Sequence, residues 1–222
     1  EPGFLSILHP GSARITLPPA ALRSTGRRTA LAKWITSPDN PLTSRVMVNR
    51  LWQQHFGRGL AANASDFGKL GEPPTHPGLL DWLAARFVAD GWSHKKMHRR
   101  MVTSATYRQA SINAHSEQAD PANTWFARAP IRRLSAEQVR DGLLAVSGEL
   151  DLESGGEGVV ADESNRRSIY RKVMRNSPDE VMHTFDSTDH ISHMPQRNVT
   201  TTATQSLLLL NSEWTRNRAA AL

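Results

Sequence analysis

The sequence predicts a mainly α-helical fold: a compact multi-helix domain with long irregular loops and at most a minimal β element. Apolar residues recur at helical spacing in several stretches. Many of these stretches open on a capping residue or close on a glycine. Only residues 168–173 alternate convincingly like a strand. We therefore expect helices over 27–36, 42–56, 77–90, 94–104, 136–148 and 203–218.

The domain organisation follows from length and composition. The chain has 222 residues, enough for one large domain or two small ones. Residues 1–26 are rich in proline, glycine and small side chains, which predicts an extended N-terminal arm or linker. Residues 27–222 are expected to form a single helical domain, the truncated C-terminal module of a longer protein.

The clearest predicted helix covers residues 42–56. Asn40 is expected to cap its N-terminus, with Pro41 at the first helical position and Gly57 just past its end. One face of this helix is apolar, whereas an overlapping face carries Arg45 and Asn49. A stripe that mixes apolar and hydrogen-bonding side chains is the best functional lead in the sequence.

The other elements have recognisable ends. Gly91 ends the helix over 77–90, and Ser93 caps the helix over 94–104. Capping boxes predict two further helix starts, at Ser135 with Gln138 and at Thr202 with Gln205. The buried stripe of the helix over 136–148 is expected to be Val139, Leu143, Val146 and Leu150. Residues 178–185 could form a short helix, and 58–75, 112–130 and 186–199 read as loops.

Composition excludes several classes of protein. The chain has no cysteine, which excludes disulfides, zinc–thiolate sites and covalently attached haem within it. No run of about 18 apolar residues is present, so we expect no membrane span. The formal net charge of +6 is compatible with nucleic acid, an anionic glycan or an acidic partner. Its densest part, residues 94–100, is interpreted as a solvated helix face.

A group of imidazoles and carboxylates raises the question of a metal site. Such groups at short spacing can bind zinc, iron or manganese, although no HExxH pattern is present. A metal site and a polar loop are the two main interpretations, and an acid–base or substrate-contact role is a third. The residues concerned are His183, Asp186, Asp189, His190 and His193.

Two further polar groups could form a ligand site. The first surrounds the helix over 42–56, and either orders a loop through a buried Arg–Asp pair or lines a cleft for a sugar or carboxylate; it comprises Asp39, Asn49, Arg50, Asn63 and Asp66. The second is residues 196–205, where backbone amides at a helix start lie beside hydroxyls and Arg197. This second group either caps the helix or binds an anion.

The chain lacks the GxSxG, P-loop and GxGxxG patterns, which weighs against nucleophile-elbow hydrolases, P-loop NTPases and dinucleotide-binding folds. A helix-turn-helix around Asn49 is also disfavoured, because Trp52 and Phe56 belong in a core.

Several blocks together resemble one family, the C-terminal domain of unknown function in planctomycete and verrucomicrobial proteins that also carry a cytochrome-C-like segment. The resemblance covers almost the whole chain. The matching blocks are residues 26–35, 40–52, 56–60, 66–68, 76–77, Leu80 with Leu83 and Ala84, 106–109, 132–134, 166–170, 185–186, 197–201, 204–205 and 209–211. Ala203 stands where a proline is common in the family.

The resemblance implies a large exported or periplasmic protein with further domains upstream, one of which would carry a haem. It assigns no activity, so catalytic residues are unknown and no cofactor is expected in this domain. Ten polar residues match the family pattern and form the candidate ligand-binding cleft: Arg45, Asn49, Arg50, Asp66, Arg108, Asp186, Arg197, Thr200, Thr201 and Gln205. His190 and His193 do not belong to the pattern.

Three functions from different classes are compatible with these observations. The first is an accessory, ligand-binding module that docks on an upstream domain of the same polypeptide and helps to form a cleft for a glycan or another anionic ligand. The second is the catalytic domain of a periplasmic carbohydrate-active or redox enzyme. The third, nucleic-acid binding, is not favoured. Convergence of Arg45, Asn49, Asp66, Asp186 and Arg197 in one pocket would favour the enzyme.

Overall fold

The computed structural model describes residues 3–9, 11–13, 15–19, 24–160, 164–174, 179–188 and 194–222. Helices make up 43% of the described residues, which confirms the mainly α prediction. In the described ranges β structure is limited to isolated bridges, which pair Gly3 with Ser12, Asp151 with Arg166, and Val159 with Arg171. No helix in these ranges has the length and apolarity needed to cross a membrane.

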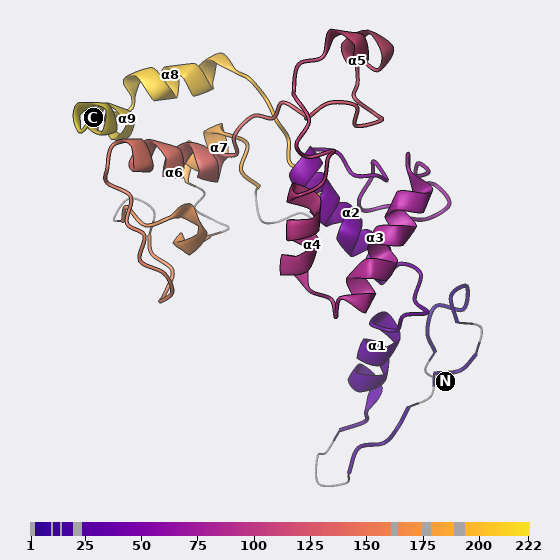
Figure 1. Cartoon of the computed structure of the whole chain (residues 1–222). Coiled ribbons are helices and arrows are strands. Elements are labelled where there is room, and N and C mark those ends of the chain that lie inside the picture. The colour runs from indigo at the N-terminus through magenta and orange to yellow at the C-terminus, as the bar shows by residue number, and fades with distance from the viewer. Residues whose placement is uncertain are drawn as a thin grey trace. The chain divides into compact units, whose positions relative to one another are not determined.

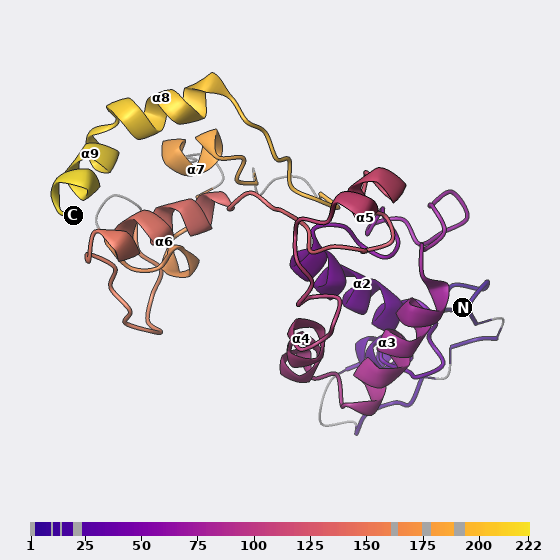
Figure 2. The ribbon, with the colours of Figure 1, turned by 45° about the horizontal axis from the view of Figure 1, so that its top comes forward.

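The chain divides into two compact units, Glu1–Ile131 and Arg132–Leu222. The first contains α1 (Arg27–Ile35), α2 (Thr43–Phe56), α3 (Pro77–Ala89), α4 (His94–Val102) and α5 (Ala114–Ala119). The second contains α6 (Ala136–Val146), the 3-10 turn η3 (Ser168–Tyr170), α7 (Glu180–Thr184), α8 (Ala203–Asn211) and α9 (Glu213–Ala220). Each unit is shown in Figure 1 and, turned, in Figure 2.

The first unit is built on α2, which packs against both α3 and α4 (Figure 2). The apolar faces of these three helices are buried against one another and against Phe126. The indole of Trp52 stacks on Phe56 at 4.0 Å between ring centroids, and Phe126 meets both rings edge-on or nearly so. The buried residues are Val48, Leu51, Trp52, Phe56, Leu60, Leu80, Leu83, Ala84, Phe87, Met97, Met101 and Phe126.

The start of α2 differs from its prediction. The N-cap residue is Leu42 and not Asn40, although Oδ1 of Asn40 accepts hydrogen bonds from the amides of Leu42 at 3.0 Å and Thr43 at 3.2 Å. Pro41 also lies before the helix and not at its first position. Its carbonyl accepts a hydrogen bond from the Arg45 guanidinium at 2.7 Å. The first α2 hydrogen bond instead runs from the Val46 amide to the carbonyl of Leu42.

Residues 112–130, predicted as a polar connection, contain the short helix α5. Its N-terminus is capped by Asn113, whose Oδ1 accepts a hydrogen bond from the Ser116 amide at 3.1 Å. The helix has six residues and buries only Ser116, so it lacks the apolar periodicity by which longer helices are predicted.

The second unit has a much smaller apolar core than the first. Ala136, Met182 and Phe185 are buried, with Val139, Val181 and Leu208 packed beside them. Both capping boxes are confirmed, at the starts of α6 and α8. The short helix expected within 178–185 is present as α7.

Three predictions in the second unit are wrong. Residues 168–170 form a 3-10 turn and not a strand, because Asp141 of α6 binds the amide and hydroxyl of Ser168 at 2.8 and 2.6 Å. The helix predicted over 203–218 breaks at Ser212, whose backbone is extended and whose hydroxyl caps α9. The face that α6 buries carries Ala136, Arg140 and Leu144, and Val146 is exposed.

Candidate functional site

The candidate cleft residues are distributed over both units. Arg45, Asn49, Arg50, Asp66 and Arg108 belong to the first unit, whereas Asp186, Arg197, Thr200, Thr201 and Gln205 belong to the second. Each set is described within its own unit, and the convergence of the two sets in one pocket stays a prediction.

Arg45 ties α2 to α3 and to the turn before α2. Its Nε lies 2.7 Å from Oδ1 of Asp81, and the same guanidinium reaches the Pro41 carbonyl. The Asp81 side chain is 58% exposed, so the ion pair is screened by solvent. This geometry indicates that Arg45 joins α2 to α3.

Asn49 is completely buried and binds the backbone of one residue. Its Oδ1 accepts a hydrogen bond from the amide of Ala61 at 2.9 Å, and its Nδ2 donates to the carbonyl of Ala61 at 3.0 Å. The loop passes so close that a Cβ on Gly59 would lie 2.7 Å from Nδ2 of Asn49. Asn49 therefore supplies the hydrogen bonds that a strand or helix would otherwise give this buried loop.

The remaining members of the first set do not gather around Asn49. Oδ1 of Asp66 accepts a hydrogen bond from the Gly68 amide at 2.9 Å, which closes a turn within its own loop. Arg108 is exposed just beyond α4, and Arg50 is partly buried in α2. Within the first unit, the described contacts thus give these side chains separate roles.

The second set does contain a cluster, centred on Asp186. One carboxylate oxygen of Asp186 accepts from the amide of Thr200 at 2.8 Å, and the other accepts from the Thr200 hydroxyl at 2.8 Å. Gln205 donates to the Thr184 carbonyl at 2.9 Å and lies 3.4 Å from Asp186. The amide of Thr200 is the main cause of the lowered pKa of Asp186, which outweighs the opposing effect of burial.

Asp186 also adopts a left-handed backbone conformation, with φ at 61°. This conformation is uncommon outside glycine, and aspartate tolerates it better than most residues. The three residues Asp186, Thr200 and Gln205 hold α7 against the start of α8. In the stretch before α8, predicted either to cap the helix or to bind an anion, Thr200 thus donates to the carboxylate of Asp186, and binding of an external anion stays a prediction.

Two arginines continue this cluster. Arg133 binds the Thr200 carbonyl and donates to the Thr201 hydroxyl at 3.1 Å. Arg197 lies with one terminal nitrogen 2.8 Å from each carboxylate oxygen of Glu137. Burial is the largest single influence on the pKa of Glu137 and opposes its ionisation, but the hydrogen bonds from Arg197, Ser135 and the Glu137 amide, together with the charge of Arg197, lower the pKa to about 2.

The metal interpretation gains no support from the described residues. Within them, no group of three or more histidine, cysteine, aspartate or glutamate side chains could hold a metal ion. His183 lies exposed in the last turn of α7. Asp189, His190 and His193 fall outside the described residues, so the proposed His–Asp site stays a prediction.

Sequence reasoning missed the buried Arg140. It is 3% exposed and donates to the carbonyls of Ser164 at 2.7 Å and Arg166 at 2.9 Å, holding the loop before η3 against α6. Burial is the main cause of its lowered pKa. An arginine four residues after Ala136 and four before Leu144 lies on their face, and this spacing was the available signal.

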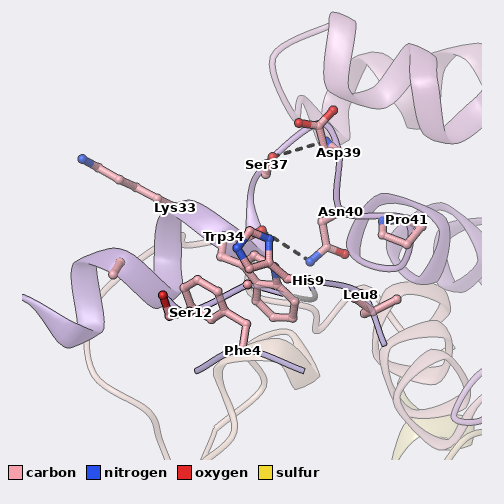
Figure 3. Close-up of a pocket in the computed structure, with 12 residues that line it drawn as sticks. Phe4, Leu8, His9, Ser12, Lys33, Trp34, Ser37, Asp39, Asn40 and Pro41 are labelled. Atoms are coloured by element: carbon pink, nitrogen blue, oxygen red, sulfur yellow. Dashed lines mark hydrogen bonds between the residues drawn. The ribbon is translucent and has the colours of Figure 1, made fainter. Parts of the chain in front are cut away.

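A cavity of about 600 Å³ lies elsewhere in the first unit, between the N-terminal arm, α1 and the turn before α2. It was not predicted from the sequence. The ring of Phe4 stacks on Trp34 of α1 at 4.9 Å, with only 4° between the ring planes (Figure 3). His9 packs edge-on against Phe4. Asn40, 7% exposed, also lines this cavity.

The fold and these contacts define a mainly helical module of two units. Its polar residues that match the family pattern largely bind other groups of the module itself. Residues 27–222 match the family model described as PSD1, a protein of unknown function (DUF1553), and the chain belongs to this family. The match includes both units and leaves out the N-terminal arm. No curated protein and no solved structure matches the chain.

Proposed function

We propose that this chain is a non-catalytic accessory module of a longer exported polypeptide, and that it docks on an upstream domain through the apolar face of α8. The observation that carries the proposal is the burial pattern of this helix. Its glutamine, Gln205, is 2% exposed, whereas Leu207 and Leu210 are 55% and 71% exposed. A helix that buries a glutamine side chain and exposes its leucines has an apolar face that can pack against a second apolar surface.

The two leucines are three residues apart and therefore share one side of α8. Leu209 is also exposed, at 37%, but lies on another side of the helix. Full burial of a leucine side chain stabilises a contact by about 1.5–3 kcal/mol. Leu208, by contrast, packs on the small core of the second unit, so α8 has an inner and an outer apolar contact.

The non-catalytic part of the proposal is supported by the contacts of the residues that match the family pattern. Arg45, Asn49, Asp186 and Arg197 each bind another group of their own unit. These contacts hold loops and helix ends in place, which is a structural role. The resemblance to modules of cytochrome-linked planctomycete proteins supports an upstream domain as the partner, an exported location, and a haem carried outside this cysteine-free chain.

Hydrogen exchange read by mass spectrometry tests the docking. We expect the amides of α8 to exchange at least 10-fold more slowly in the full-length natural protein than in the 222-residue chain, and the double substitution Leu207→Ser, Leu210→Ser to abolish that difference. Leu152→Ser is the matched control, because Leu152 is equally exposed but lies in a loop of the same unit. Equal exchange of α8 in the two proteins would refute the proposal.

A further inference from the structure

The cavity beside α1 carries an inference that does not depend on the docking of α8. It is lined by the arm, by one side of α1 and by the turn that leads into α2. Its volume of about 600 Å³ lies in the usual range for small-molecule sites, about 300–1,000 Å³. The arm is held closed by the bridge between Gly3 and Ser12, and by the amides of Leu8 and His9, which both donate to the Leu5 carbonyl.

Asn40 supplies a buried hydrogen-bond donor to this cavity. Its Oδ1 is occupied by the two amides at the start of α2, which fixes the orientation of the side chain. Its Nδ2 carries two hydrogens. In the part of the chain that the structure describes, the acceptor of Nδ2 is the Trp34 carbonyl, at a long 3.4 Å (Figure 3). The amide thus retains donor capacity for an oxygen of a ligand.

The apolar part of the wall consists of aromatic rings. Phe4 and Trp34 form one continuous stack, and the flat, electron-rich faces of such rings suit the C–H groups of a saturated ring. Serine hydroxyls lie in the same lining, at Ser12 and Ser37, and each can both donate and accept. The lining therefore alternates apolar surface with neutral hydrogen-bonding groups.

Formal charge is kept at the rim. Lys33 and Asp39 both line the cavity, but Figure 3 shows their charged ends extending away from the aromatic rings. Their charges are opposite, and Asp39 is exposed to solvent. A ligand that lies between the rings and Asn40 would consequently meet amide, hydroxyl and aromatic groups, which favours a neutral molecule over a phosphate or carboxylate.

We propose that this cavity binds a neutral polyhydroxylated ring of monosaccharide size. Its hydroxyl oxygens would accept from Nδ2 of Asn40, its hydroxyl hydrogens would reach the serines, and its C–H face would lie against the ring stack. Phe4 belongs to the arm outside the family match, so the arm completes the site as one wall.

The test uses the 222-residue chain and a panel of neutral sugars: glucose, galactose, xylose, fucose and N-acetylglucosamine. Binding is followed by NMR, through the side-chain amide signals of Asn40 and the indole signal of Trp34. We expect at least one sugar to bind with a Kd on the order of 1 mM, typical of a small exposed site. Asn40→Asp keeps the accepting oxygen and removes the donor, so we expect at least 10-fold weaker binding with unchanged thermal unfolding.

Two further variants accompany this test, one as a control for the amide change and one for the aromatic wall. Asn113→Asp makes the same change at the exposed N-cap of α5, where Oδ1 accepts a hydrogen bond from the Ser116 amide, and should leave binding unchanged. Phe4→Ala removes part of the wall at a position that lies outside the helices, and should weaken binding at least five-fold. The proposal fails if no sugar shifts these signals at about 50 mM, or if Asn40→Asp and Phe4→Ala both bind as the unchanged chain does. Tighter binding of N-acetyl-phenylalaninamide than of every sugar would also overturn it and assign the cavity to peptides.

Discussion

The two units are stabilised by different kinds of contact. In the first, three helices and Phe126 bury a continuous set of large apolar side chains. In the described part of the second, three apolar residues are buried together in a small cluster, and arginines and carboxylates join the helices and loops. The comparison teaches that the first unit adds ion pairs such as Arg100–Asp90 to a large apolar core, whereas the second depends more heavily on ionised and hydrogen-bonded groups.

The largest expected effect is a cavity in the first unit. Phe87 is 1% exposed and packs in the core that α2, α3 and α4 share. Phe87→Ala should lower the free energy of unfolding of this unit by about 4 kcal/mol, because the lost burial is accompanied by an unfilled void. Hydrogen exchange should accelerate in α2–α4 and stay unchanged in α6–α8. Equal acceleration in both units would show that they unfold as one body and would break the comparison.

The second prediction concerns the buried arginine of the second unit. Arg140→Met keeps the length of the side chain but leaves the carbonyls of Ser164 and Arg166 without their donor. We expect a loss of about 3 kcal/mol, since buried acceptors without partners are costly. Exchange should accelerate in α6 and in residues 164–174, while the first unit stays protected. A stability equal to that of the unchanged chain would mean that packing, and not charge, holds this unit.

The third prediction tests a fully buried polar contact of the first unit. Asn49→Ala removes two buried hydrogen bonds to Ala61 and should cost about 2 kcal/mol. Arg45→Ala is the comparison variant, and should cost well below 1 kcal/mol because its partner Asp81 is exposed. Urea unfolding followed by fluorescence measures both. A larger cost for Arg45 than for Asn49 would reverse the structural roles assigned here.

The sequence predicted best where local rules decide. Gly57 ends α2 in a left-handed conformation, and the boxes at Ser135 and Thr202 start α6 and α8, because caps depend on residues three or four positions apart. Two local predictions failed where a side chain binds the backbone of the predicted segment. The Pro41 carbonyl is taken by Arg45, and the segment over 168–170 is bound by Asp141, so neither follows its own propensity.

The candidate sites were harder to predict, for a related reason. A polar residue on a helix face looks the same in the sequence whether it binds a ligand or a neighbouring loop, and Asn49 proves to bind Ala61. The cavity joins Phe4 of the N-terminal arm to Trp34 and Asn40, which lie 30 and 36 positions further along the chain. Such pairings depend on tertiary packing, which no periodicity in one sequence encodes.

The smallest expected effect is a dependence on acid that belongs to the second unit. Although burial opposes its ionisation, hydrogen bonds from Arg197, Ser135 and its own amide, with the charge of Arg197, lower the pKa of Glu137 to about 2 from its ordinary value of 4.5, and the pKa of Asp186 is lowered as well. A lowered pKa stabilises the folded unit fully above the unfolded value, and this contribution is lost as the pH falls from about 4.5 towards 2. Glu137 is about one-third exposed, so we expect less than about 1 kcal/mol from this pair. Hydrogen exchange of α6 and α8 between pH 5 and pH 3, corrected for the intrinsic rate, should report the loss. Glu137→Gln should flatten it, whereas Asp81→Asn in the first unit should not. If α2–α4 weaken with acid as much as α6–α8, the division into a packed unit and a charged unit is wrong.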